Sequence, residues 1–120
     1  MSGANQQDET SVLLRFSGFL HKEIRFDRAE LSLILNLYGR HVAGGEWRDY
    51  ALDFGRDIAS FSVFRRSSEQ PLYRIIKNPA LARKNGLYSV VAQGGLIVKR
   101  GNDLLQVLTV LEKRPKLADA

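Results

Sequence analysis

The sequence predicts an α+β fold: an antiparallel, meandering sheet of about five strands with a long helix and a C-terminal helix packed on one face. Three observations lead to this prediction. Apolar residues recur at helical spacing within 27–44 and again within 104–111. Between these stretches, apolar and polar residues alternate, and short turn-forming segments separate the runs. Strands that follow each other through short loops pair antiparallel, so both helices are expected on the same face.

Length and composition are those of one globular domain. The chain has 120 residues, 44% hydrophobic and 26% charged, enough to bury a core without covalent cross-links. We expect a single domain over 11–114, a disordered tail at 1–10 and a flexible C-terminus at 115–120. Cysteine is absent, which excludes disulfides and thiolate metal sites. No apolar run is long enough to span a bilayer and no secretory signal is present, so we expect a cytoplasmic protein.

The first expected elements are a strand at 22–26 and the long helix that follows it. Polar and apolar residues alternate over 22–26, as in a half-buried strand. Asp27 and Glu30 have the spacing of a reciprocal capping box, and Gly44 with Gly45 ends the helix. The expected core-facing stripe consists of Leu31, Ile34, Leu35, Tyr38 and Val42.

The remaining elements complete the meander and close the fold. The period-two runs predict strands within 49–54, 58–64, 72–77, 87–92 and 96–100. Gly94 and Gly95 are typical of a tight hairpin between the last two strands, and Ala80–Lys84 is expected to form one helical turn. The closing helix presents a stripe of leucine and valine residues and ends before Pro115.

Positive charge is concentrated in one stretch. Residues 65–100 hold eight basic side chains and one acid, Glu69, for a net +7 in 36 residues. The basic residues are Arg65, Arg66, Arg74, Lys77, Arg83, Lys84, Lys99 and Arg100. Such a field attracts polyanions or acidic proteins, and phosphate contacts need only correctly spaced cations. The leading hypothesis is therefore a non-enzymatic module that binds nucleic acid without reading its sequence; the alternative is that these cations scatter over solvated sheet faces.

Two tyrosines occur in the same stretch. Tyr73 and Tyr88 could stack on bases, as aromatic residues do in sheet-based RNA-binding proteins. Strand alternation, however, places Tyr73 with Ile75 and opposite Arg74, which favours a core position for Tyr73.

A second hypothesis is a protein-interaction or regulatory subunit. Leu33 and Leu37 lie on the side of the long helix opposite the expected stripe, and Trp47 comes just after the helix. These three residues form an apolar strip that either mediates homodimerisation or is covered by another element.

A third and distant hypothesis is an enzyme that uses His41, Glu46 and Asp49. The two histidines of the chain lack the spacing of metal ligands, so we expect no metal and no cofactor. His41 suits the negative end of the helix dipole, and Asp49 belongs to a strand face that we expect to be solvated. These structural roles explain His41 and Asp49 more simply than catalysis does.

Several segments resemble domain-of-unknown-function family 2794, which consists of small bacterial proteins found mainly in alphaproteobacteria. The segments that carry the resemblance are Leu37–Arg40, Gly45–Tyr50, Phe61–Arg66, Pro71–Ile75 and Tyr88–Val91. The similarity covers roughly 26–111. It implies a bacterial cytoplasmic protein with a single domain, and it provides no activity or site residues to transfer.

Overall fold

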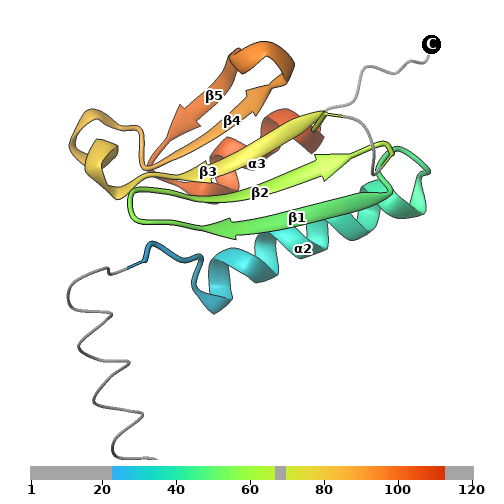
Figure 1. The fold of residues 1–120 in the computed structure, drawn as a ribbon, viewed down its shortest axis with the longest axis horizontal. Helices are drawn as coiled ribbons and strands as arrows, with labels where there is room; N and C mark the ends of the chain where they lie inside the picture. The colour runs from blue at the N-terminus through green and yellow to red at the C-terminus, as the bar shows by residue number, and fades with distance from the viewer. Residues whose placement is uncertain (1–22, 67–69, 113–120) are drawn as a thin grey trace, which may run out of the picture.

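The computed structural model describes residues 23–66 and 70–112, which form a five-stranded antiparallel sheet and two α-helices (Figure 1). The strands, paired in sequence order, are β1 (Asp49–Phe54), β2 (Ala59–Phe64), β3 (Tyr73–Lys77), β4 (Tyr88–Ala92) and β5 (Ile97–Gly101). The helices are α2 (Arg28–Ala43) and α3 (Leu104–Glu112). The predicted α+β meander is confirmed. The predicted tails at 1–10 and 115–120 lie outside the described residues.

The core lies between the two helices and one face of the sheet. Phe61, Ile75 and Val90 occupy one row across β2, β3 and β4, and all three are fully buried. Ile34 of α2 and Leu108 of α3 belong to the same buried cluster. Both helices therefore cover the same face, and the opposite face of the sheet carries no described helix (Figure 1).

The orientation of α2 differs from the expected one. Leu35 and Val42, which we placed in the core stripe, are 42% and 41% exposed, whereas Leu37 is 1% exposed. The cause is α3, because His41 on the same side as Leu37 is bonded to the Leu111 carbonyl. The buried side of α2 is therefore turned toward α3, and the side chains of Leu35 and Val42 are exposed to solvent.

The expected strand at 22–26 is not formed in the described part. Ile24 makes an isolated antiparallel bridge to Gly55, with its N–H donating to the Gly55 carbonyl at 2.7 Å. Phe26 is buried instead, with its ring edge-on to Phe54. The segment before α2 is thus held against the end of β1 by one bridge and a buried aromatic contact, and not by a strand ladder.

Two local features determine the shape of the sheet beyond β3. A 3₁₀ helix, η1 (Pro79–Lys84), confirms the expected helical turn, and it ends at Asn85 with a positive φ of 56°. A β-bulge between Val90 and Val91 shifts the register of β5, so Lys99 pairs with Val90 while Ile97 pairs with Val91. No helix in the described ranges is long and apolar enough to cross a membrane.

Candidate functional site

The predicted cations do not gather on one surface. Arg65 and Arg66 follow the end of β2, whereas Arg83 and Lys84 lie on η1, after the end of β3. Because β2 and β3 run antiparallel, these two pairs lie at opposite ends of the sheet (Figure 1). The stretch that is continuous in sequence is therefore divided in space.

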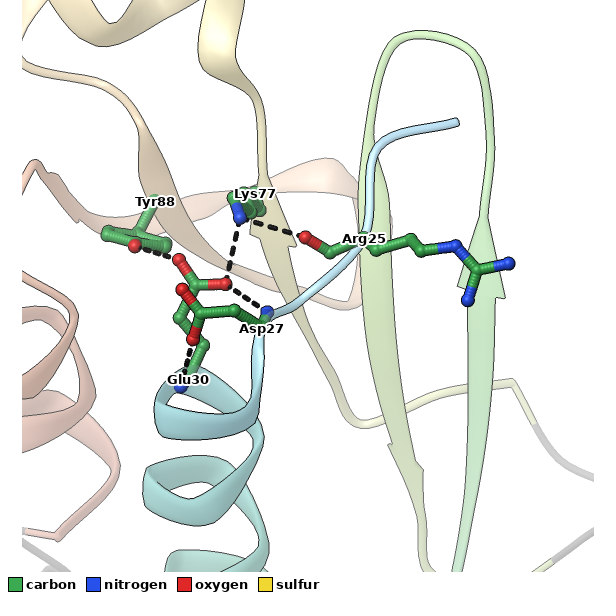
Figure 2. Close-up of polar contacts among 5 residues, drawn as sticks. All are labelled: Arg25, Asp27, Glu30, Lys77 and Tyr88. Atoms are coloured by element: carbon green, nitrogen blue, oxygen red, sulfur yellow. Dashed lines mark hydrogen bonds and ion pairs between the residues drawn. The ribbon is translucent and has the colours of Figure 1, made fainter. Parts of the chain in front are cut away.

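Lys77 is largely buried and paired, so its ammonium group is not part of an exposed binding surface. Its Nζ donates to Glu30 Oε1 and to the Arg25 carbonyl, each at 2.8 Å (Figure 2). Its side chain is 17% exposed. This lysine therefore neutralises a buried carboxylate and does not contribute to a field that a partner would meet.

Glu30 is the centre of a buried polar network (Figure 2). Asp27 N–H donates to Glu30 Oε1 at 2.7 Å, and Glu30 N–H donates back to Asp27 Oδ1 at 2.8 Å, which completes the predicted capping box. The Tyr88 hydroxyl donates to Glu30 Oε2. Burial, followed by this hydrogen bond, raises the pKa of Tyr88 well above its usual value. The network fixes the N-terminus of α2 to β3 and β4.

Neither tyrosine of the basic stretch is placed to stack on a nucleic-acid base. Tyr88 is 8% exposed, and its hydroxyl donates a hydrogen bond to Glu30. Tyr73 is half-buried on the helix side of β3 and packs against the core, as alternation predicted.

A smaller group of cations comes together where η1 meets β5. Asn102 joins the two, because its Oδ1 accepts from Leu87 N–H at 3.0 Å and its Nδ2 donates to the Ala82 carbonyl at 2.7 Å. Arg100 extends over the same loop: its Nη2 lies 3.4 Å from the position that a Cβ on Gly86 would take.

We call Arg83, Lys84, Lys99 and Arg100 the basic corner. All four are exposed, and none makes an ion pair within the described ranges. Lys99 and Arg100 project to opposite faces of β5, because successive residues of a strand alternate. The corner therefore supplies positive charge on both sides of this strand. Arg74, in contrast, is half-buried on the helix-free face of β3.

The strand that carries two of these cations is an edge of the sheet. β5 pairs with β4, and no strand within 23–66 or 70–112 pairs with its other side. Leu96, Ile97 and Val98 are 67%, 50% and 38% exposed. We call residues 96–100 the β5 edge: three exposed aliphatic side chains followed by two cations on a backbone with unpaired donors and acceptors.

The predicted apolar strip of Leu33, Leu37 and Trp47 is not an exposed surface. Leu37 and Trp47 belong to the core, Leu33 is half-buried against it, and the indole stacks on His41 with ring centroids 4.0 Å apart. α3 and the sheet cover this side of α2, which corrects the interface prediction for these residues.

Exposed apolar side chains lie instead on the other side of α2, beside β1, the first strand of the described sheet. Leu35, Val42, Tyr50 and Leu52 are 37–48% exposed. Tyr38 connects the helix to the strand, with its ring edge-on to Tyr50 at a centroid distance of 5.0 Å. We call these five residues the α2–β1 surface.

His41 and Glu46 are paired, but their arrangement is structural. His41 Nδ1 lies 2.8 Å from Glu46 Oε1, and Nε2 lies 2.9 Å from the Leu111 carbonyl oxygen. Both contacts are to acceptors, so the doubly protonated ring can donate to both. A cavity of about 250 Å³ borders the pair, and Asp49 is not among its described lining residues. Each ring nitrogen of the buried His41 lies within hydrogen-bond distance of an acceptor, and these contacts join α2 to Glu46 and α3.

No group of three potential metal ligands occurs in the part of the chain that the structure describes.

A family model described as Protein of unknown function (DUF2794) matches residues 24–108. The chain belongs to this family. The match confirms the resemblance seen in the sequence segments, and it extends from the Ile24 bridge to Leu108 in α3. No similar curated protein and no similar solved structure was found. The function of this DUF2794 protein must therefore be inferred from its own surfaces.

Proposed function

We propose that the protein is an interaction module that takes an extended, acidic segment of a partner protein along the β5 edge. The observation that carries this proposal is the combination, on five successive residues, of a strand edge and two cations that have no partner among the described residues with three exposed aliphatic side chains. The expected location is the cytoplasm, which the absence of cysteine suits.

Strand addition uses each part of this edge. A partner strand bonds to the free backbone of β5, and its apolar side chains cover Leu96, Ile97 and Val98. Carboxylates on the partner then meet Lys99 and Arg100, while Arg83 and Lys84 enhance the attraction at longer range. Main-chain bonds give affinity, and the order of apolar and acidic residues gives specificity.

Nucleic acid fits the same edge less well. Phosphates need cations, and single strands also need aromatic surfaces on which the bases stack. Tyr73 and Tyr88 are not available for stacking, and exposed aliphatic side chains contribute nothing to phosphate binding. Nucleic-acid binding, the leading hypothesis from the sequence, is therefore kept as an outcome that the test distinguishes.

The test uses a fluorescein-labelled peptide of alternating valine and glutamate, about ten residues long, and fluorescence anisotropy at low salt. We expect the double variant Leu96→Ser/Ile97→Ser to weaken binding at least about tenfold, because the apolar cover is lost. Lys99→Ser/Arg100→Ser should also weaken binding and reduce its salt dependence. The matched control, Leu35→Ser/Tyr50→Ser at the opposite edge, should bind like the wild type.

Three results contradict the proposal: no binding of the valine–glutamate peptide, equal binding of a valine–lysine peptide, or no effect of Leu96→Ser/Ile97→Ser. Binding of a labelled oligouridylate that depends on the basic corner and is unchanged by Leu96→Ser/Ile97→Ser assigns the surface to nucleic acid instead.

A second candidate function is self-association through the α2–β1 surface. This surface also joins exposed apolar side chains to an edge strand, since no described strand pairs with the outer side of β1. A two-fold axis perpendicular to the sheet beside β1 would extend the sheet across two copies. Sedimentation velocity decides: Leu35→Glu/Tyr50→Ser should convert a dimer to a monomer, whereas Leu96→Ser/Ile97→Ser should leave the dimer intact. A wild-type protein that is monomeric at high micromolar concentration rules out this candidate.

A further inference from the structure

We infer that the C-terminal end of α2 forms a binding site for a small organic anion, with an oxyanion group held by arginines and an apolar body against Val42 and Trp47. This site is separate from the β5 edge and does not depend on the proposed function. It lies where α2 ends, β1 begins and β2 ends.

The adjoining ends of β1 and β2 bring two arginines to one cavity. Asp49 is the register partner of Phe64, and Arg48 N–H also donates to the Phe64 carbonyl, at 2.8 Å, so the pairing is displaced by one residue where β1 begins. Arg48 just before β1 and Arg65 just after β2 both line the cavity described below. Arg48 is 17 residues before Arg65 in sequence and lies outside the basic stretch 65–100, so the charge pattern of the sequence does not connect the two.

A cavity of about 540 Å³ opens between these residues and the end of α2. Its described lining consists of Val42, Gly45, Trp47, Arg48, Arg65 and Arg66, and includes no acidic side chain. This volume is within the range of small-molecule sites.

The arginines that line this cavity make it positively charged, which favours the binding of an anion. Like charges that line one cavity repel each other, and neither Arg48 nor Arg65 makes an ion pair within the described residues. The end of α2 is the negative end of its dipole, which is unfavourable for an anion, but the two full charges of Arg48 and Arg65 outweigh this partial one.

The lining also indicates the class of ligand. A guanidinium presents a planar fork that matches carboxylate and phosphate oxygens in a bidentate manner. Val42 and Trp47 form an apolar part of the wall, which an inorganic ion would leave uncovered. A carboxylate or phosphate that carries an aromatic or aliphatic group contacts both the arginines and the apolar wall of the site.

The single tryptophan of the chain reports on this cavity, because Trp47 lines it. We expect phenyl phosphate and benzoate to change the Trp47 emission saturably. The Arg48→Gln/Arg65→Gln variant should weaken this binding at least about tenfold, since both guanidinium forks are lost. Arg83→Gln/Lys84→Gln removes the same number of charges at the other end of the sheet and should bind like the wild type.

Val42→Glu is a second test variant that keeps both arginines. Its exposed position should allow normal folding, checked by thermal unfolding, and its carboxylate should abolish binding by repulsion within the cavity. The inference is overturned if emission shows no saturable change, if either pocket variant binds like the wild type, or if the control variant loses binding equally. Inorganic phosphate that binds as tightly as phenyl phosphate overturns the assigned ligand class.

Discussion

At the level of single residues, Glu30 has two structural roles that the sequence pattern reveals only in part. Its carboxylate completes the capping box with Asp27, and it also binds Lys77 and Tyr88 from two strands. The carboxylate is buried, and burial of an unpaired charge would be costly, so these donors are required for the fold. The i, i+3 spacing of Asp27 and Glu30 predicted the first role, whereas Lys77 and Tyr88 are too distant in sequence to be connected with it.

Tyr88→Phe should lower the free energy of unfolding at pH 7 by about 1–3 kcal/mol, because Glu30 Oε2 loses its donor. The folded-state pKa of Tyr88 is raised above the unfolded value of about 10, so the protonated hydroxyl stabilises the fold fully below that pH. This contribution is lost as the pH rises through the folded-state pKa.

Urea denaturation of both proteins at pH 7 and above pH 10 measures the effect. The difference in unfolding free energy between wild type and Tyr88→Phe should narrow at the higher pH. A difference that stays constant with pH would contradict the proposed role of the hydroxyl.

At the level of elements, the orientation of α2 decides which apolar residues are core. The helix boundaries and cap were predicted correctly, because they depend on local sequence: Asp27, Glu30 and the glycines at 44 and 45. The buried side was predicted only in part: Leu31, Ile34 and Tyr38 pack in or against the core, but Leu35 and Val42 do not. Apolar residues on two sides of a helix do not reveal which side faces the neighbouring helix. Contact between His41 and Leu111, 70 residues apart, supplies that information only in the folded chain.

Two substitutions test this orientation. Leu37→Ala should cost about 2–5 kcal/mol, because it leaves a cavity in the core. Leu35→Ala removes the same atoms at an exposed position and should cost less than about 1 kcal/mol. Chemical denaturation provides both values, and equal costs would support the stripe that the sequence alone suggested.

At the level of the whole molecule, the strand order explains why a continuous basic stretch does not form one surface. The meander was predictable, because each strand follows the last through a short turn. Arg65 and Arg83, however, end up at opposite ends of the sheet, and Lys77 is neutralised inside it. The β5 edge and the meeting of Arg48 with Arg65 at one cavity depend on how the strands pair and where they end, which residue types alone do not specify.

The same architecture holds α2 at both ends by polar contacts. Near its N-terminus, Glu30 binds Lys77 and Tyr88; near its C-terminus, His41 binds Glu46 and the Leu111 carbonyl. His41 is eleven positions after Glu30, so the two anchors are about 16 Å apart along the helix axis. Each anchor joins α2 to a different partner, the sheet at one end and α3 at the other.

We therefore expect the two anchors to contribute independently to stability. His41→Phe keeps a flat ring against Trp47 but removes both hydrogen bonds, and it should cost about 1–3 kcal/mol. In a double-mutant cycle with Tyr88→Phe, the two losses should add to within about 0.5 kcal/mol, because the sites share no partner. Urea denaturation of the wild type, both single variants and the double variant provides the coupling energy. A coupling above about 1 kcal/mol would mean that α2 transmits a displacement from one end to the other, since direct contact between the anchors is excluded by their separation.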